Sequence, residues 1–191
     1  MAKQYTTVEN IESYLLIEID DAFEPEVEQW IEAISLYMDS LANRTLMAGA
    51  DDVAYKFDGI GGTQLSVADI QSITSVVVDG ITIDSDDYYL YPANTAPKSR
   101  IVLENKNFLR GRQNVVITGK FGQYADGALP ADLTLAATIL TAGVVNHGQA
   151  KGRKVQSETI GRYSVSYATE KGWNDYERAM HIIRSHRRFS F

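Results

Sequence analysis

The side chains that most often do chemistry are thinly spread in this sequence. Cysteine is absent, which excludes disulfides and every zinc or iron–sulfur site that depends on thiolate ligands. The three histidines, His147, His181 and His186, share no i,i+4 spacing and stand in no metal-ligand motif. We therefore expect the histidines to be structural or surface residues, and we expect no metal site.

Two segments resemble ligand-binding loops only in part. Gly59-Ile60-Gly61-Gly62 lacks the lysine and the following helix of a phosphate-binding loop, so we interpret it as a turn between strands. Asp84-Ser85-Asp86-Asp87 opens like a calcium loop but lacks the required glycine and the distal glutamate. No serine stands in a nucleophile-elbow motif. The sequence therefore predicts a protein that is not an enzyme and that binds no cofactor.

The last residues combine arginine with aromatic side chains, in the run Arg187-Arg188-Phe189-Ser190-Phe191. These residue types are enriched at the energetic centres of binding interfaces. The alternative is a frayed tail without a function of its own. The candidate interface consists of Arg184, Arg187, Arg188, Phe189 and Phe191.

A second candidate surface lies between residues 149 and 171. A basic cluster there is followed by an alternation of tyrosine or valine with serine. Alternation of this kind is typical of a strand, so the segment is either a hairpin arm or a mobile loop. The candidate contact residues of this arm are Lys151, Arg153, Lys154, Tyr163, Val165 and Tyr167.

Four segments have the apolar spacing of helices. We expect these helices to position the two candidate surfaces. The four segments lie at about residues 8–17, 25–43, 130–147 and 175–188. Thr6 and Glu9 have the spacing of a capping box for the first, and Asn174 is placed to cap the last. The third is apolar on nearly all sides, which predicts a helix at the centre of a small bundle.

Between the second and third helices the pattern changes to strand alternation, from about residue 53 to 121. Asp79-Gly80 stands between two β-branched runs, which indicates a tight hairpin. We predict an α+β fold, in which a bundle of about four helices carries an inserted antiparallel β-sandwich or barrel-like module. The predicted helical base, with its arm and C-terminal tail, comprises residues 1–50 and 128–191, and the inserted module comprises residues 51–127.

Charge is divided unevenly along the chain. Residues 1–96 carry 18 acidic and 3 basic side chains, whereas residues 97–191 carry 7 acidic and 15 basic ones. Either the two halves pair within one molecule, or the acidic face of one copy meets the basic face of the next. The longest apolar-rich run, residues 133–145, is too short to cross a bilayer, so we expect no membrane partner.

Four stretches resemble the head–tail connector proteins of long-tailed bacteriophages, also called adaptor or head-completion proteins. The stretches are residues 7–17, 27–39, 136–140 and 157–165. The similarity covers the first two helices and the region after Pro130. The smallest family members lack the β region, so the resemblance implies no role for it.

The resemblance implies a non-enzymatic ring subunit, with twelve copies per ring, in the neck of a virion that assembles in the host cytoplasm. Such rings dock under the portal protein and present a platform to the next neck or tail protein. By resemblance, the last helix and the tail with Arg187, Arg188 and Phe191 would contact the portal. The arm from Lys151 to Tyr167 would contact a neighbouring subunit or line the channel, with non-specific contact to DNA.

Two alternatives stay open at this point. The first is another neck protein, a stopper or tail terminator, although those are usually β-sandwiches without a long helical base. The second is a nucleic-acid-binding module that uses the basic C-terminal half, where Arg100, Arg110, Arg112 and Lys120 could form a stripe. Steep salt dependence of DNA binding would favour this second class.

Overall fold

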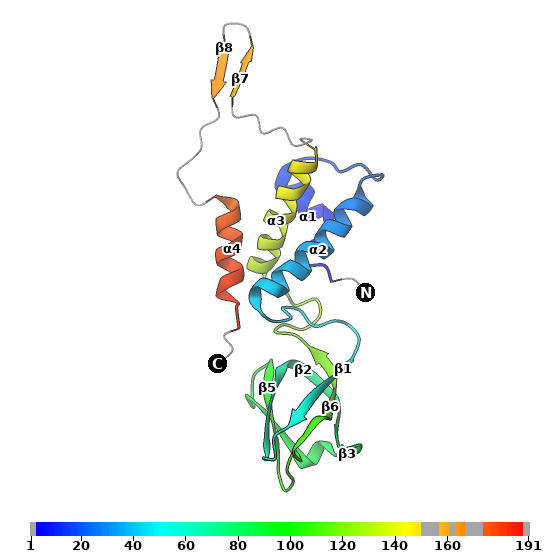
Figure 1. Cartoon of the computed structure of the whole chain (residues 1–191). Coiled ribbons are helices and arrows are strands. Elements are labelled where there is room, and N and C mark those ends of the chain that lie inside the picture. The colour runs from blue at the N-terminus through cyan, green and yellow to red at the C-terminus, as the bar shows by residue number, and fades with distance from the viewer. Residues whose placement is uncertain (1–2, 150–156, 161–162, 167–173, 189–191) are drawn as a thin grey trace. The chain divides into compact units, whose positions relative to one another are not determined.

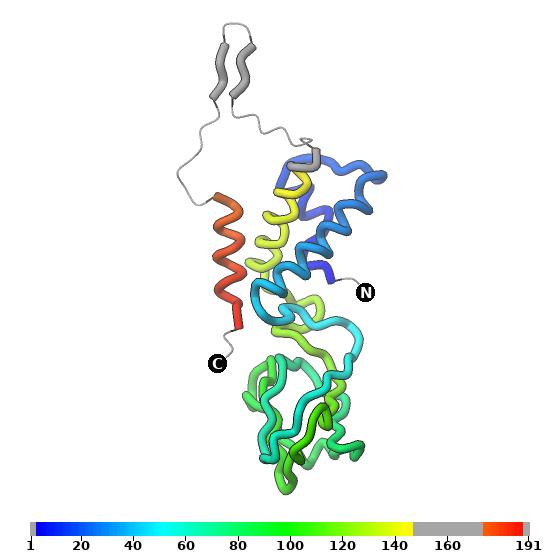
Figure 2. Tube along the Cα trace, viewed as in Figure 1, coloured from blue at the N-terminus to red at the C-terminus, as the bar shows by residue number. Residues whose placement is uncertain are grey.

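The computed structural model describes residues 3–149, 157–160, 163–166 and 174–188. The chain forms two compact units. Of the described residues, the helical unit contains those up to Met38 and those between 130 and 186, and the β unit contains residues 39–129 with Arg187 and Arg188. Figure 2 traces the chain from the second helix into the strands and from the last of those strands into the third helix.

The four predicted helices are present, with small differences at their ends (Figure 1). They are α1 (Val8–Leu15), α2 (Glu24–Ala42), α3 (Ala131–Gln149) and α4 (Asp175–Ser185). Helix α1 ends earlier than predicted because Leu16 adopts a left-handed conformation, with φ of 56°. Its cap is Thr7, whose hydroxyl accepts a hydrogen bond from the Asn10 amide. The predicted cap Thr6 is wrong, because its hydroxyl is buried against that of Thr138 at 2.7 Å.

Helix α3 is the central helix of its unit, as its apolar character predicts. Ala136, Ala137, Ile139, Leu140 and Ala142 are all buried, which is the burial expected of a helix packed on several sides. It shares one hydrophobic cluster with α1 and α2, made of Ile11, Val27, Ile31, Ala142 and Val145. It also packs against α4, which buries Ala179, Met180 and Ile183.

The predicted α+β class is confirmed, with an antiparallel six-stranded sheet inserted between α2 and α3. The strand order is β1-β6-β2-β5-β4, with β3 paired to β2, so the sheet is open rather than a closed barrel. Register shifts divide the 15-residue β2 into a part that pairs with β5 and a part that pairs with β6. Such shifts bend a strand. The bounds are β1 (Val53–Gly59), β2 (Gln64–Val78), β3 (Ile81–Ile83), β4 (Tyr88–Tyr91), β5 (Lys98–Leu103) and β6 (Gly111–Phe121).

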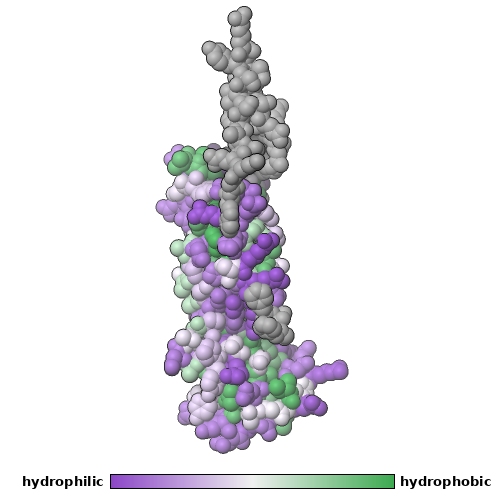
Figure 3. Space-filling model, turned by 90° about the vertical axis from the view of Figure 1, so that its left-hand side faces the viewer, coloured by the Kyte–Doolittle hydropathy of each residue, from purple (hydrophilic) through white to green (hydrophobic). Residues whose placement is uncertain are grey.

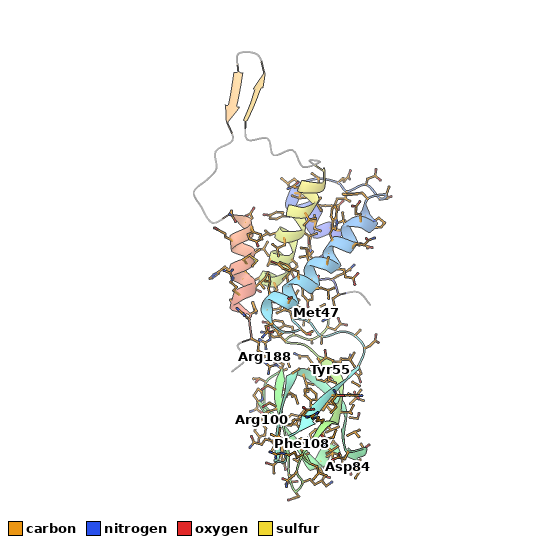
Figure 4. The ribbon with its side chains drawn as sticks, in the orientation of Figure 1. Met47, Tyr55, Asp84, Arg100, Phe108 and Arg188 are labelled. Atoms are coloured by element: carbon orange, nitrogen blue, oxygen red, sulfur yellow. The ribbon has the colours of Figure 1, made fainter. Side chains whose placement is uncertain are left out.

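Local sequence signals set the turns of this sheet. Asp79 and Gly80 have φ of 50° and 80°, which is the double left-handed geometry of a tight hairpin turn. The predicted turn at Gly59–Gly62 is also confirmed. There the Gly61 amide donates to the Phe108 carbonyl at 2.8 Å, and the Phe108 amide donates to the Gly62 carbonyl at 2.8 Å. These bonds hold the fully buried Phe108 among the strands (Figure 4).

A separate two-stranded antiparallel sheet follows α3 in the chain. It consists of β7 (Ser157–Ile160) and β8 (Tyr163–Ser166). Of the two alternatives for this region, the described residues form the hairpin arm.

Candidate interaction surfaces

The helical unit has an apolar groove of about 510 Å³ to which all four helices contribute. Several of its side chains are exposed although they are large and apolar, which is unusual for a surface without a partner. Tyr37 is 43% exposed and Tyr176 is 56% exposed. Its lining also includes Tyr14, Ile34, Ile139, Leu140, Val144 and Asp175.

A hydrogen bond joins α1 to the first turn of α4 at this groove. The Tyr14 hydroxyl donates to Asp175 Oδ2 at 2.8 Å. Burial, followed by this hydrogen bond to a carboxylate, raises the pKa of the Tyr14 hydroxyl. The side chain of Asn174 accepts from the Glu177 amide, which confirms it as the cap of α4. One polar contact therefore joins two of the helices that line this apolar groove.

A second polar contact joins the end of α4 to the start of α3. His186 Nε2 lies 3.0 Å from Asp132 Oδ2, and it must donate because a carboxylate oxygen only accepts. Burial raises the pKa of Asp132, but the hydrogen bonds from His186 and from the Leu133 amide lower it more, so the net pKa is below its ordinary value. A carboxyl with a lowered folded-state pKa stabilises the fold above its ordinary pKa and loses that effect as the pH falls through the lowered one.

Replacing His186 with alanine should therefore raise the pKa of Asp132 towards its ordinary value, since its main hydrogen-bond donor is removed. The carboxyl can be titrated by NMR in both chains. We also expect the loss of unfolding free energy caused by His186→Ala to be larger above the ordinary pKa of Asp132 than at a pH below its lowered pKa, where the carboxyl is protonated in both chains. An unchanged Asp132 titration would contradict this assignment.

The candidate interface residues at the end of the chain differ in exposure and in contacts. Arg184 is exposed in the last turn of α4, and Arg187 is exposed beyond the helix, which ends earlier than predicted. Phe189 and Phe191 lie outside the described residues. Arg188 is held within the β unit, where its amide donates to the Ala42 carbonyl at 2.9 Å. Its guanidinium also donates to the Val67 carbonyl at 3.3 Å.

Arg188 adjoins a buried ion pair formed by Arg44 and Asp69. Arg44 donates through Nε and Nη2 to Asp69 Oδ2, at 2.8 and 2.6 Å. The side chain of Asp69 is 7% exposed and that of Arg44 is 16% exposed. Arg188 Nη1 lies 3.9 Å from the other carboxylate oxygen. The pair therefore ties the segment after α2, the middle of β2 and the residue at the start of the tail together.

The arm residues are only partly described. Lys151, Arg153, Lys154 and Tyr167 lie outside the described residues, whereas Tyr163 and Val165 belong to β8. The register places Ile160 opposite Tyr163 and Glu158 opposite Val165. Because alternate residues of a strand share a face, these four positions lie on one face of the hairpin. The other face carries only the hydroxyl residues Ser157, Thr159, Ser164 and Ser166.

The possible basic stripe of the β unit is spread out. Arg112 and Lys120 both lie on β6 but are eight residues apart, which is about 27 Å along a strand. Arg100 lies on β5, which β2 separates from β6. Its guanidinium stacks over the Tyr91 ring at 5.0 Å. Arg110 is exposed in the segment before β6. These four side chains therefore do not form one compact cluster.

The described side chains include no group of three or more histidine or acidic residues that could hold a metal ion. The calcium-like segment forms the short helix η1 (Ser85–Asp87), in which Asp87 pairs with Lys106. Over the same part of the chain, no helix has the length and apolar character to cross a membrane. On the face shown in Figure 3, hydrophilic residues cover much of the surface and hydrophobic residues form small patches.

One family model matches nearly the whole chain. It is described as Head completion protein (HCP), and it matches residues 4–189. No curated protein matches the chain.

Three solved structures have a similar fold, at sequence identities too low to show more than that. One is described as the neck of an empty GTA particle computed with C6 symmetry, with 15% identity, a TM-score of 0.60, and coverage of 96% of this chain and 90% of that one. Another is the neck of a native GTA particle computed with C12 symmetry, with 14% identity, a TM-score of 0.55, and coverage of 100% and 97%. The third is the virion of a native gene transfer agent (GTA) particle, with 15% identity, a TM-score of 0.56, and coverage of 100% and 91%.

Proposed function

Because the chain belongs to the head completion protein family, we propose that it is a structural subunit of a phage-like neck, where it links the DNA-filled head to the tail. The observation that carries this proposal is the match of the family model to residues 4–189, which is nearly the whole chain. The similar fold of chains from GTA necks, over 96% or more of this chain, supports it. The protein would then be a component of the virion that assembles in the host cytoplasm.

The subunits would form a ring, which we propose to contain twelve copies. Two of the similar structures are necks computed with C6 and C12 symmetry. A closed ring uses two different surfaces of each subunit at every contact. The acidic first half and the basic second half of this chain suit such a head-to-tail contact, because opposite charges favour encounter in one register. The role is one of assembly rather than of catalysis.

The partners of the ring would be the portal protein on one side and a downstream neck or tail protein on the other. We assign the portal contact to Arg184, Arg187, Phe189 and Phe191, with Arg188 at the base of the tail. Arg188 bonds to Ala42 and Val67 within the β unit, so it is placed to orient the residues that follow. The arm of residues 151–167 would contact a neighbouring subunit or the DNA in the channel. We further propose that residues 51–127 are the module added to a helical base.

Complementation of tailless particles tests this function. DNA-filled heads made without this chain should remain unable to accept tails, and the purified protein should restore tail attachment. Negative-stain images of the mixture should show added density at one vertex of each head. Heads that complete and join tails normally without the chain would overturn the proposal.

A further inference from the structure

The helical groove is an apolar surface that the described part of the chain leaves open. Residues from all four helices line it, and Tyr37, Val144 and Tyr176 are each at least 36% exposed. Its volume of about 510 Å³ lies within the range of about 300–1,000 Å³ that is typical of ligand-sized clefts. A surface of this kind is usually covered in the assembled state of a protein.

The β7–β8 hairpin has a face with apolar residues that could pack against a partner. Its register gathers Ile160, Tyr163 and Val165 on one face, together with Glu158. An isolated two-stranded hairpin is at best marginally stable in water, and it gains stability when an apolar face packs on another element. The opposite face, made only of serine and threonine, is suited to contact with water.

Charge favours a meeting of these two surfaces between copies. Residues 9–32 carry nine acidic and no basic side chains, and they include Tyr14 of α1, which lines the groove. Residues 150–173, which include the hairpin, carry five basic and two acidic side chains. Opposite charge around an apolar contact directs the encounter of the two partners.

We infer that the hairpin of one copy docks the face formed by Ile160, Tyr163 and Val165 into the helical groove of a second copy. This inference rests on the proposed ring and names the contact that closes it. Each subunit contributes its groove to one neighbour and its arm to the other, which is the arrangement that a closed ring requires. Apolar burial supplies the stability of the contact, and the surrounding charges set its direction.

Disulfide trapping tests this contact, because the chain has no cysteine of its own. Two single-cysteine chains, Val144→Cys in the groove and Val165→Cys on the arm, are co-assembled into particles and oxidised. The matched control replaces Val165→Cys with Ser164→Cys, which lies on the hydroxyl face of the same strand. A disulfide requires its two Cα atoms to lie within about 7 Å, so the trap reports docking rather than collision. Thermal unfolding checks that each variant folds.

We expect the groove and arm variants to form a linked dimer that is lost with the Ser164→Cys control. Particles that contain the chain but give no more linked dimer than the control would overturn the inference while leaving the proposed function standing. A double variant that cross-links within one chain would overturn it as well, since the arm would then occupy its own groove. Particles that lack the chain would contradict the proposed function instead. The same disulfide trap in oligomers of the purified variants would then test the arm contact.

Discussion

Replacing Asp69 with alanine is expected to lower the unfolding free energy of the β unit by about 3 kcal/mol. Asp69 is 7% exposed and accepts two hydrogen bonds from Arg44. Removing one partner of a buried ion pair leaves the other charge desolvated and uncompensated, which typically costs about 3–5 kcal/mol. We place the effect at the lower end, about 3 kcal/mol, because Arg44 keeps some access to water. Urea unfolding followed by circular dichroism measures the difference.

The matched control for this experiment is Asp87→Ala, which breaks the ion pair with Lys106. There the side chains are 36% and 51% exposed, and exposed pairs contribute about 0–1 kcal/mol. We therefore expect Asp69→Ala to lower the unfolding free energy by more than Asp87→Ala does. An Asp69→Ala chain that unfolds at the same urea concentration as Asp87→Ala would show that the buried pair does not hold the β unit together.

Removing residues 189–191 is expected to abolish docking of the ring to the portal while leaving the fold intact. The truncation removes both phenylalanines of the proposed contact but keeps Arg188, whose bonds to Ala42 and Val67 lie within the β unit. Aromatic side chains supply much of the energy of a typical interface. Co-sedimentation of the truncated chain with DNA-filled heads measures docking, and thermal unfolding measures the fold.

Two arginine variants distinguish the contribution of the tail to docking from a general effect of removing positive charge. Arg188→Ala should weaken docking, because the tail loses its attachment at the buried pair. Arg112→Ala removes another basic side chain, exposed on β6, and should leave docking unchanged. If the chain without residues 189–191 sediments with heads as well as the full chain does, residues 189–191 are not part of the portal interface.

Elements whose signals are local could be predicted from the sequence. The spacing of Val27, Ile31 and Met38 predicts one face of α2, and all three side chains are buried. The Asp79-Gly80 turn and the Asn174 cap are likewise set by neighbouring residues. The continuous apolar character of α3 predicted its central place, because only a helix covered on several sides can bury such a surface.

Contacts between distant residues could not be predicted in this way. The Thr6 hydroxyl is drawn to Thr138, 132 residues away, and the cap of α1 moves to Thr7. Tyr176 stands four residues before the buried Met180 on α4, yet it is exposed in the groove. The groove depends on four helices, so no single segment encodes it. A faint signal for the buried pair does exist, since Asp69 follows Leu65 and Val67 on the buried face of β2, where alternation would place another apolar residue.

The central claim is that this chain is a ring subunit in the neck of a virion, and a cryo-EM map of that neck tests it most directly. Purified particles that carry this chain should show density for its helices and its six-stranded sheet repeated around the channel axis between head and tail. We expect twelve copies, with the arm of each seated on its neighbour. A complete neck in which every density is accounted for by other proteins would contradict the account.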